Sequence, residues 1–445
     1  MVLKNCLDHL LRPLVIFFFF FFIFFHHLSF TANAEKIINI ESLGAKGDGT
    51  TDSSPAMLQA WEGACKNSTE PTTIIVPSKK YFLSSAKLDG PCTNKFTITF
   101  QMEGSTLIAP DYTKMSDSKG LPLDYWVIFQ TVQGVSLIGG ALEAQGKTLW
   151  DCKGGAASAQ CPPGATSLAF FGSKDVKIQN LTSNDAKLYH IVIHSSLNVT
   201  VEGGRIEAPG DSPNTDGIHV QNSTQVRVDG TTIMTGDDCI SIGPATRDLH
   251  IEGVNCGPGH GISIGSLGKD AIEEGVEGVV VMNSTFTGST NGVRIKSWAR
   301  PSTAFVRGVI FQKIIMNNVI NPIIIDQNYC PHNIGCPPQT LGNRTEISNV
   351  TYTDITGTSA SEVAVNFNCS VTPPCKDIKL QDINLNYIGG NITERFCLNA
   401  YGSVLGGGII KPPSCLKTLP PSILRGGIIK PPTFLMDLPL LFGDL

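Results

Sequence analysis

A polar signature that recurs at a fixed interval is the feature that most constrains this chain. Between residues 212 and 265 the segments SPNTDGIHV, TGDDCISIG and GPGHGISIG each join a titratable residue to a short aliphatic strand. Asp216, Asp238 and His260 follow one another at intervals of 22 residues, and the aliphatic positions keep the same period. A fixed period of about 20 to 50 residues is typical of a solenoid, in which each repeat packs on its neighbours.

Short β-branched strands continue this pattern on both sides of the signature. Equivalent strand positions are separated by 23, 27, 23 and 30 residues, at Val176, Val199, Val226, Leu249 and Val279. Fainter copies follow in GVIFQKI, NVTYTDI and DIKLQDI. Strands of period two, turns rich in Gly and Asn, and repeats of about 22 to 30 residues predict an all-β right-handed parallel β-helix. A doubly wound α/β fold would need amphipathic helices between the strands, and none are visible.

The N-terminus reads as a targeting segment. Lys4 and Arg12 precede an apolar run of 12 residues (14–25), which is followed by the small-residue sequence TANA. A membrane span needs about 18 or more apolar residues. Residues 1–34 are therefore predicted to be a secretory signal peptide and not a membrane anchor.

The remaining chain is predicted to form one domain with a short appendage. Residues 35–415 make up the expected β-helix domain, and a helix beginning at Ser54 is expected to cap its N-terminal end. Residues 416–445 are interpreted as an appendage, because GGIIKPP at 407–413 is repeated at 426–432. The prolines of the second copy are not expected to extend a β-ladder.

Cysteine usage agrees with secretion. Without Cys6, twelve cysteines remain, an even number that suits an oxidising compartment. A zinc site is the alternative, but no two pairs show the two-residue spacing of zinc knuckles, so no metal is predicted. Nine Asn-x-Ser/Thr sequons fit a glycosylated extracellular surface. Four close cysteine pairs are plausible disulfides: Cys152 with Cys161, Cys239 with Cys256, Cys330 with Cys336, and Cys369 with Cys375.

Composition narrows the class of partner. The chain has 41% hydrophobic residues, only 16% charged residues and a net charge of −5, so it can bury a large core but offers no basic field for nucleic acid. We predict no nucleic-acid partner and no membrane partner.

Stacking of the repeats is expected to gather the titratable residues. Residues one turn apart lie about 4.8 Å apart along a β-helix, so Asp216, Asp238 and His260 should form one column, with Asp237 beside it. Alternation should bury the isoleucines that follow and should send four residues to the outer face: His219, Ser241, Ser263 and Arg294. The acids precede the regular strand, at a turn that contains Gly236, so alternation alone does not fix their direction. Taken singly, each motif is typical of a turn, but stacked like charges cost stability and indicate a compensating role.

The residue types suit hydrolysis of an anionic sugar polymer. Glycoside hydrolysis uses one protonated acid for the leaving oxygen and one carboxylate that activates water. Three crowded acids cannot all ionise cheaply, so one should stay protonated toward neutral pH. Arg294 and Lys296, on one face of a strand, are suited to bind a substrate carboxylate.

Four segments carry a resemblance to a known family. SPNTDGIHV, TGDDCISIG, CGPGHGISIGSLG and NGVRIKSW, in this order and spacing, resemble the signature set of polygalacturonases, which cut the homogalacturonan of pectin. The similarity runs from Ile37 to Cys415 and is strongest to plant members, especially the exo-acting, pollen-type group. The chain departs from the family pattern at EAQG (143–146) and at Lys269 and Asp270.

The resemblance implies a mechanism and a location. It implies an open cleft, inversion at the anomeric carbon, no cofactor, and a pectic substrate in the plant cell wall, where the protein is expected to act as a monomer. Asp237 would be the general acid, and Asp216 and Asp238 would position and activate the water. His260 would tune the protonation of the acid. The substrate would be bound by Arg294, Lys296 and Tyr329.

Two other classes stay open. A pectate lyase shares the β-helix but eliminates, and it needs calcium and an arginine base. A wall-binding protein without activity is the non-enzymatic alternative, although the intact acids argue against it.

Overall fold

The structure is a computed structural model that describes residues 35–117, 119–155, 158–331, 336, 344–390 and 392–419. The predicted signal peptide and the second GGIIKPP copy lie outside the described residues, so both remain predictions.

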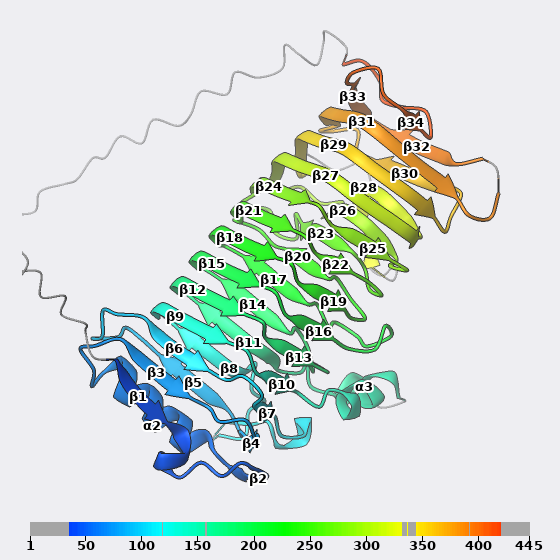
Figure 1. The fold of residues 1–445 in the computed structure, drawn as a ribbon. Helices are drawn as coiled ribbons and strands as arrows, with labels where there is room; N and C mark the ends of the chain where they lie inside the picture. The colour runs from blue at the N-terminus through cyan, green and yellow to red at the C-terminus, as the bar shows by residue number, and fades with distance from the viewer. Residues whose placement is uncertain are drawn as a thin grey trace, which may run out of the picture.

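Parallel strands stacked along one axis form a right-handed β-helix, as predicted (Figure 1). Within the described residues, one face is an 11-stranded sheet, which we call the front sheet. Its strands are β5 (Ala86–Asp89), β8 (Tyr125–Gln130), β11 (Thr166–Phe171), β14 (Ile191–His194), β17 (Ile218–Gln221), β20 (Ile240–Ile242), β23 (Ile262–Leu267), β26 (Asn291–Trp298), β28 (Asn321–Tyr329), β30 (Val363–Asn368) and β32 (Glu394–Leu398).

The other faces are formed by two ladders that merge at the long strand β27 (Phe305–Val319). The first ladder contains β1 (Lys36–Asn39), β3 (Thr72–Ile75), β6 (Ile98–Gln101), β9 (Gln133–Ile138), β12 (Lys174–Gln179), β15 (Leu197–Glu202), β18 (Thr224–Asp229), β21 (Arg247–Glu252) and β24 (Val276–Met282). The second contains β2 (Asp48–Asp52), β4 (Lys80–Phe82), β7 (Thr106–Ile108), β10 (Ala141–Glu143), β13 (Thr182–Asn184), β16 (Arg205–Glu207), β19 (Thr232–Met234), β22 (Asn255–Cys256) and β25 (Thr285–Thr287). After the merger follow β29 (Glu346–Ser359), β31 (Cys375–Tyr387), β33 (Ala400–Val404) and β34 (Ile410–Lys411).

The strand positions found by spacing stack in register. The register pairs Val176 with Val199, Val199 with Val226, Val226 with Leu249 and Leu249 with Val279. All five side chains are buried in the single hydrophobic core that runs along the axis. The variable repeat length is therefore absorbed by the loops, while the aliphatic column is kept.

A second column explains the polar residue that precedes each of these strands. Asp175, Asn198, Gln225 and Asp248 have φ between 52° and 58°, and Gly278 continues the column at 70°. This left-handed conformation favours Gly, which has no Cβ to clash with the backbone, and Asn and Asp, whose short polar side chains can hydrogen-bond locally. The Asn198 amide also donates to the Asp175 carboxylate at 2.6 Å, so neighbouring turns are tied together.

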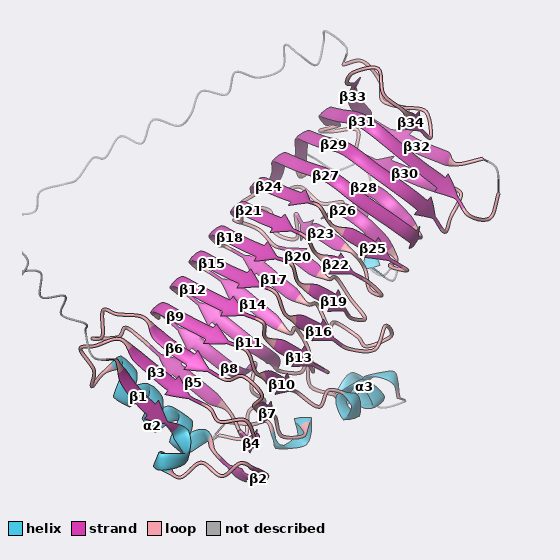
Figure 2. Cartoon of the chain, viewed as in Figure 1, coloured by secondary structure: helices cyan, strands magenta, loops and turns pink. Residues whose placement is uncertain are grey.

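Helix α2 (Ser54–Cys65) covers the N-terminal end of the core, as predicted (Figures 1 and 2). Its buried Trp61 packs edge-on against Phe129 and donates its indole N–H to the carbonyl of Asp89. The remaining helical segments are short: η1 (Ile40–Leu43), η2 (Tyr112–Lys114), α3 (Lys147–Gly154) and η3 (Ser158–Gln160). No helix among the described residues is long and apolar enough to cross a membrane.

All four predicted disulfides are present, and the other four cysteines pair as Cys65–Cys92 and Cys397–Cys415. These two pairs span 27 and 18 residues, and neither was among the pairs expected from the sequence.

The C-terminal segment up to residue 417 is bonded to the preceding strands. Ile410 and Lys411 in the first GGIIKPP copy pair with β31, directly before Pro412, so the prolines of this motif do not prevent it from joining a ladder. Lys417 also bonds to the backbone of Ala400 and Gly402. The last described coil therefore includes residue 417.

Candidate active site

A cleft of about 700 Å³ runs along the outer face of the front sheet. Its lining extends from Tyr125 on β8 to Tyr329 on β28, and Asp216, Asp237 and Asp238 lie between these ends. This cleft therefore coincides with the residues singled out from the repeat.

The predicted inward and outward columns are confirmed. Ile218, Ile240 and Ile262 are in register and buried. The outer column pairs His219 with Ser241, Ser241 with Ser263 and Ser263 with Arg294. The rigid sheet thus fixes the positions of the groups that surround the acids.

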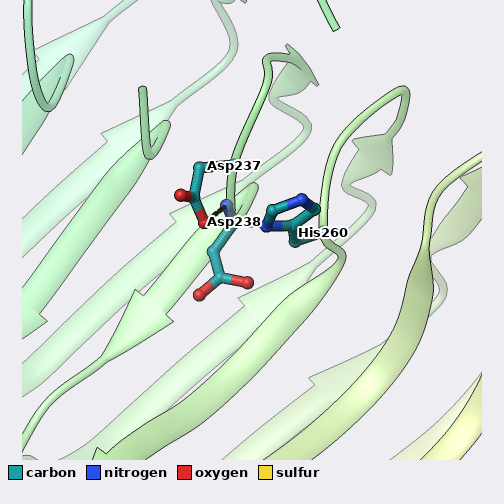
Figure 3. Close-up of side chains that lie close together, drawn as sticks. All are labelled: Asp237, Asp238 and His260. Atoms are coloured by element: carbon teal, nitrogen blue, oxygen red, sulfur yellow. Dashed lines mark hydrogen bonds and ion pairs between the residues drawn. The ribbon is translucent and has the colours of Figure 1, made fainter. Parts of the chain in front are cut away.

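Asp237 and His260 form the exposed edge of the cluster. The His260 imidazole Nδ1 lies 3.0 Å from Oδ1 of Asp237, and the backbone N–H of Asp238 donates to the same oxygen at 2.8 Å (Figure 3). Within the described part of the chain, the second oxygen of Asp237, Oδ2, has no hydrogen-bond partner. Asp237 therefore has one oxygen fixed by the protein and one available to a ligand.

Asp238 is held by two cations. Arg294 donates to its Oδ1 at 2.6 Å and Lys296 donates to its Oδ2 at 2.9 Å, while the Ser263 hydroxyl also donates to Oδ1 at 2.7 Å. Burial alone would raise the pKa of Asp238, but the charges of Arg294 and Lys296 outweigh it and hold the pKa below its ordinary value. Asp238 is thereby kept ionised.

Asp216 has the opposite environment. Burial raises its pKa well above the ordinary value, and the negative charges of Asp237 and Asp238 raise it further. The Ser241 hydroxyl and the more distant charge of Lys296 oppose this only in part. The cluster therefore contains the predicted contrast between a protonated and an ionised acid, and Asp216 is the member that favours the proton.

The predicted substrate-binding residues divide into two groups. Lys296 and Tyr329 line the cleft, and the Lys296 ammonium lies 5.3 Å from the centre of the Tyr329 ring. Arg294 contacts Asp238 and Ser263 without being part of the cleft lining. The Arg294 guanidinium therefore contacts Asp238 and does not face the cleft directly.

Asp237, Asp238 and His260 also offer donor atoms that lie within 4.8 Å of one another (Figure 3). Such a set resembles a metal site, but the Asp238 carboxylate already balances two protein cations and His260 Nδ1 is bonded to Asp237. Asp238 and the Nδ1 atom of His260 are thus already engaged by protein groups, whereas Oδ2 of Asp237 has no such partner among the described residues.

Two further aromatic residues border the acids, and the sequence did not assign them to the site. The Tyr189 ring stacks on His219, with centroids 5.1 Å apart and an interplanar angle of 16°. His219 is in turn bonded through Nδ1 to Ser241 and through Nε2 to Gln221. The outward position of His219 was visible in the alternation, whereas Tyr189 precedes β14 and shares no periodic position.

The turn that carries Asp237 requires glycine at position 236. A Cβ there would lie 2.1 Å from the carbonyl oxygen of Ser212 and 2.5 Å from its nitrogen, both backbone atoms that cannot rotate away. The Gly236 N–H also donates to the Thr215 hydroxyl at 3.0 Å. Close contact between two turns therefore places Asp237 beside the turn of Asp216.

We expect Gly236→Ala to lower the free energy of unfolding by about 1–3 kcal/mol, because overpacking forces the backbone of one turn to shift. Gly154→Ala is the control, since a Cβ at Gly154 meets no atom within 4 Å. Urea unfolding of both variants measures the difference. Equal stability of the two variants would contradict the close contact at position 236.

Comparison with known proteins assigns the chain to a family. Residues 65–404 match glycosyl hydrolases family 28, so the chain belongs to that family. A polygalacturonase from Prunus persica is 50% identical over 379 residues, covering 85% of this chain and 93% of the relative. An exopolygalacturonase from Platanus acerifolia is 40% identical over 365 residues, covering 82% and 94%. Among solved structures, an endo-xylogalacturonan hydrolase from Aspergillus tubingensis shares the fold with a TM-score of 0.68 at 22% identity, covering 84% of this chain and all of that one.

Proposed function

We propose that this protein hydrolyses the α-1,4-galacturonosyl linkages of homogalacturonan with inversion, acting from a chain end. The observation that carries the proposal is the Oδ2 atom of Asp237, unpaired within the described residues, which lies in the cleft beside Asp238, the acid that is held ionised. The names of the relatives, among them a polygalacturonase and an exopolygalacturonase, support this substrate and this mode of action.

The proposed reaction transfers two protons. Asp237 donates a proton to the glycosidic oxygen as the bond from the anomeric carbon to that oxygen breaks. A water molecule attacks the anomeric carbon from the opposite face and gives its proton to Asp238, which the two cations keep in the basic form. Asp216 positions this water, and His260 orients Asp237 and tunes its protonation through the bond to Oδ1.

The proposed binding groups reflect an anionic substrate. Lys296 and Tyr329 would contact a galacturonate carboxylate, because both line the cleft. Arg294 would support the same position through the Asp238 carboxylate that it shares with Lys296. With Asp216 protonated, the cluster repels an incoming carboxylate less than three ionised acids would.

We also propose that the protein acts as a secreted monomer in the cell wall. Six disulfides within the described residues fit an oxidising compartment. The predicted signal peptide (1–34) would be removed before the protein reaches the wall.

Product analysis on polygalacturonate tests the reaction. We expect the first product to carry the inverted anomeric configuration by NMR, monomer to be the only early product, and a chelator to have no effect. A first product with retained configuration would overturn the assigned roles. Loss of activity on chelation, with an unsaturated product, would identify a lyase, and a ladder of oligomers would identify endo action.

A further inference from the structure

One end of the cleft is lined by aromatic rings. Phe171 lies between Tyr125 and His194, with ring centroids 5.1 Å from the first and 4.7 Å from the second, and all three line the cleft. They belong to β8, β11 and β14, three successive rungs that pair in parallel. We call these three residues the aromatic arm.

The aromatic arm approaches the acids on the N-terminal side. β17, which follows Asp216, pairs directly with β14, so the arm begins one rung from the catalytic strand. From β8 to β17 the front sheet advances by three rungs of about 4.8 Å, or about 14 Å in all. This length gives room for more than one sugar ring beside the scissile bond.

The charges of the cleft are divided between its two ends. Its lining contains two cations, Lys269 and Lys296, and both lie on the β23–β26 side of the acids, where Asp270 and Glu273 also line the cleft. Around the aromatic arm the lining contains no Lys or Arg but does contain Asp124. Lys153 bonds to the carbonyl of Pro163 at 2.7 Å and is not part of the lining.

His194 does not supply the missing positive charge. Burial lowers its pKa, and its Nδ1 lies 2.9 Å from the Ser195 hydroxyl. The exposed groups of the arm are therefore neutral rings, whose faces carry partial negative charge.

A free galacturonate in this arm would bring an anion to negative ring faces and to Asp124, without a cation to pair with. A methyl ester removes that charge and adds an apolar group that packs on the rings, while the C–H face of the sugar stacks on them. The two ends of the cleft thus suit different forms of the sugar: the aromatic arm suits the methyl ester, and the lysine end suits the free carboxylate.

Resting on the proposed function, we propose that the aromatic arm binds methyl-esterified galacturonosyl residues, while Lys296 and Lys269 serve the free galacturonate on the other side of the scissile bond. The substrate class is then partly esterified homogalacturonan, cut where an esterified stretch meets a free residue.

Three hexagalacturonates test the inference at neutral pH: one unesterified, one esterified on every unit except the terminal non-reducing one, and one esterified on every unit except the terminal reducing one. We expect one of the two esterified isomers to be cut with a kcat/KM at least equal to that of the unesterified oligomer. The other isomer should be cut at least about tenfold more slowly, because its ester replaces the anion that Lys296 binds. Slow cleavage of both isomers relative to the unesterified oligomer would overturn the inference.

Variants of Phe171 assign the effect to the arm. Phe171→Ala should lower kcat/KM for the preferred esterified isomer by several-fold, up to about tenfold. It should lower kcat/KM for the unesterified oligomer by less than about twofold. Phe171→Lys should shift the preference toward the unesterified oligomer by about two- to fivefold. Phe305→Ala, on β27 and outside the cleft, is the matched control, and the thermal midpoint of each variant checks folding. Equal effects of Phe171→Ala on both oligomers would contradict the inference.

Calorimetry with Asp237→Asn separates the inference from the proposed function, because it measures binding without turnover. Tighter binding of one esterified isomer that is lost in Phe171→Ala, in a protein whose wild type cuts no oligomer, would uphold the arm and contradict the proposed hydrolase. Equal binding of all three oligomers would overturn the arm, even where hydrolysis occurs.

Discussion

Asp237→Asn should lower kcat on polygalacturonate by about 10²–10⁴-fold, the contribution usual for a positioned general acid. Asparagine preserves the shape of the side chain and can still bond to His260, but it cannot deliver a proton to the leaving oxygen. KM should change little, because Lys296 and Tyr329 still line the cleft. Steady-state kinetics with reducing-end detection measures both constants.

Asp248→Asn is the matched control for this loss. Asp248 lies at a left-handed turn position on the ladder of β21, outside the cleft lining, and asparagine suits its φ of 52°. Its kcat should stay within about twofold of the wild type. Near-normal turnover of Asp237→Asn would show that another group supplies the proton, and Asp216 would then be the first alternative because its environment favours the protonated form.

Lys296→Met should lower the free energy of unfolding by about 3–5 kcal/mol, as expected when one partner of a buried ion pair is removed. Asp238 is 2% exposed and would keep only Arg294 as a cationic partner. Lys177→Met is the control, since the Lys177–Glu202 pair is about half exposed and should be worth about 1 kcal/mol or less. Urea unfolding at neutral pH compares the two variants.

The same variant should show a distinct pH dependence. Because the folded-state pKa of Asp238 is held below its ordinary value, its ionised form stabilises the fold above the ordinary aspartate pKa of about 3.9. That stabilisation is lost as the pH falls through the lowered pKa, so the difference between Lys296→Met and wild type should shrink in acid. A difference that stays constant from neutral to acidic pH would mean that packing, and not charge, accounts for the loss.

The fold could be predicted from the sequence because a β-helix repeats its constraints locally. Val176, Val199 and Val226 occupy equivalent positions, so the spacing alone gave their register. The same alternation placed Ser263 and Arg294 on the outer face.

The details of the site depend on side-chain contacts that the spacing of the repeats does not predict. Asp238 and Lys296 are 58 residues apart, and their bond depends on how far a flexible lysine reaches across two rungs. The sequence therefore predicted that Lys296 would bind substrate, but not that it would hold Asp238. Similarly, Tyr125 and Phe171 meet over neighbouring strands although a loop with its own helix separates them in sequence.

The segment between β10 and β11 has a consequence for how such enzymes can diversify. It holds α3 and the Cys152–Cys161 disulfide, and it ends at Pro163 and Gly164, which form part of the cleft rim. Because each rung rests only on its neighbours, a loop of this kind can be exchanged or lengthened without moving the carboxylates on the floor below. Rim and floor are thus separate parts, so selection or engineering can alter which polymer enters while Asp216, Asp237 and Asp238 stay in place.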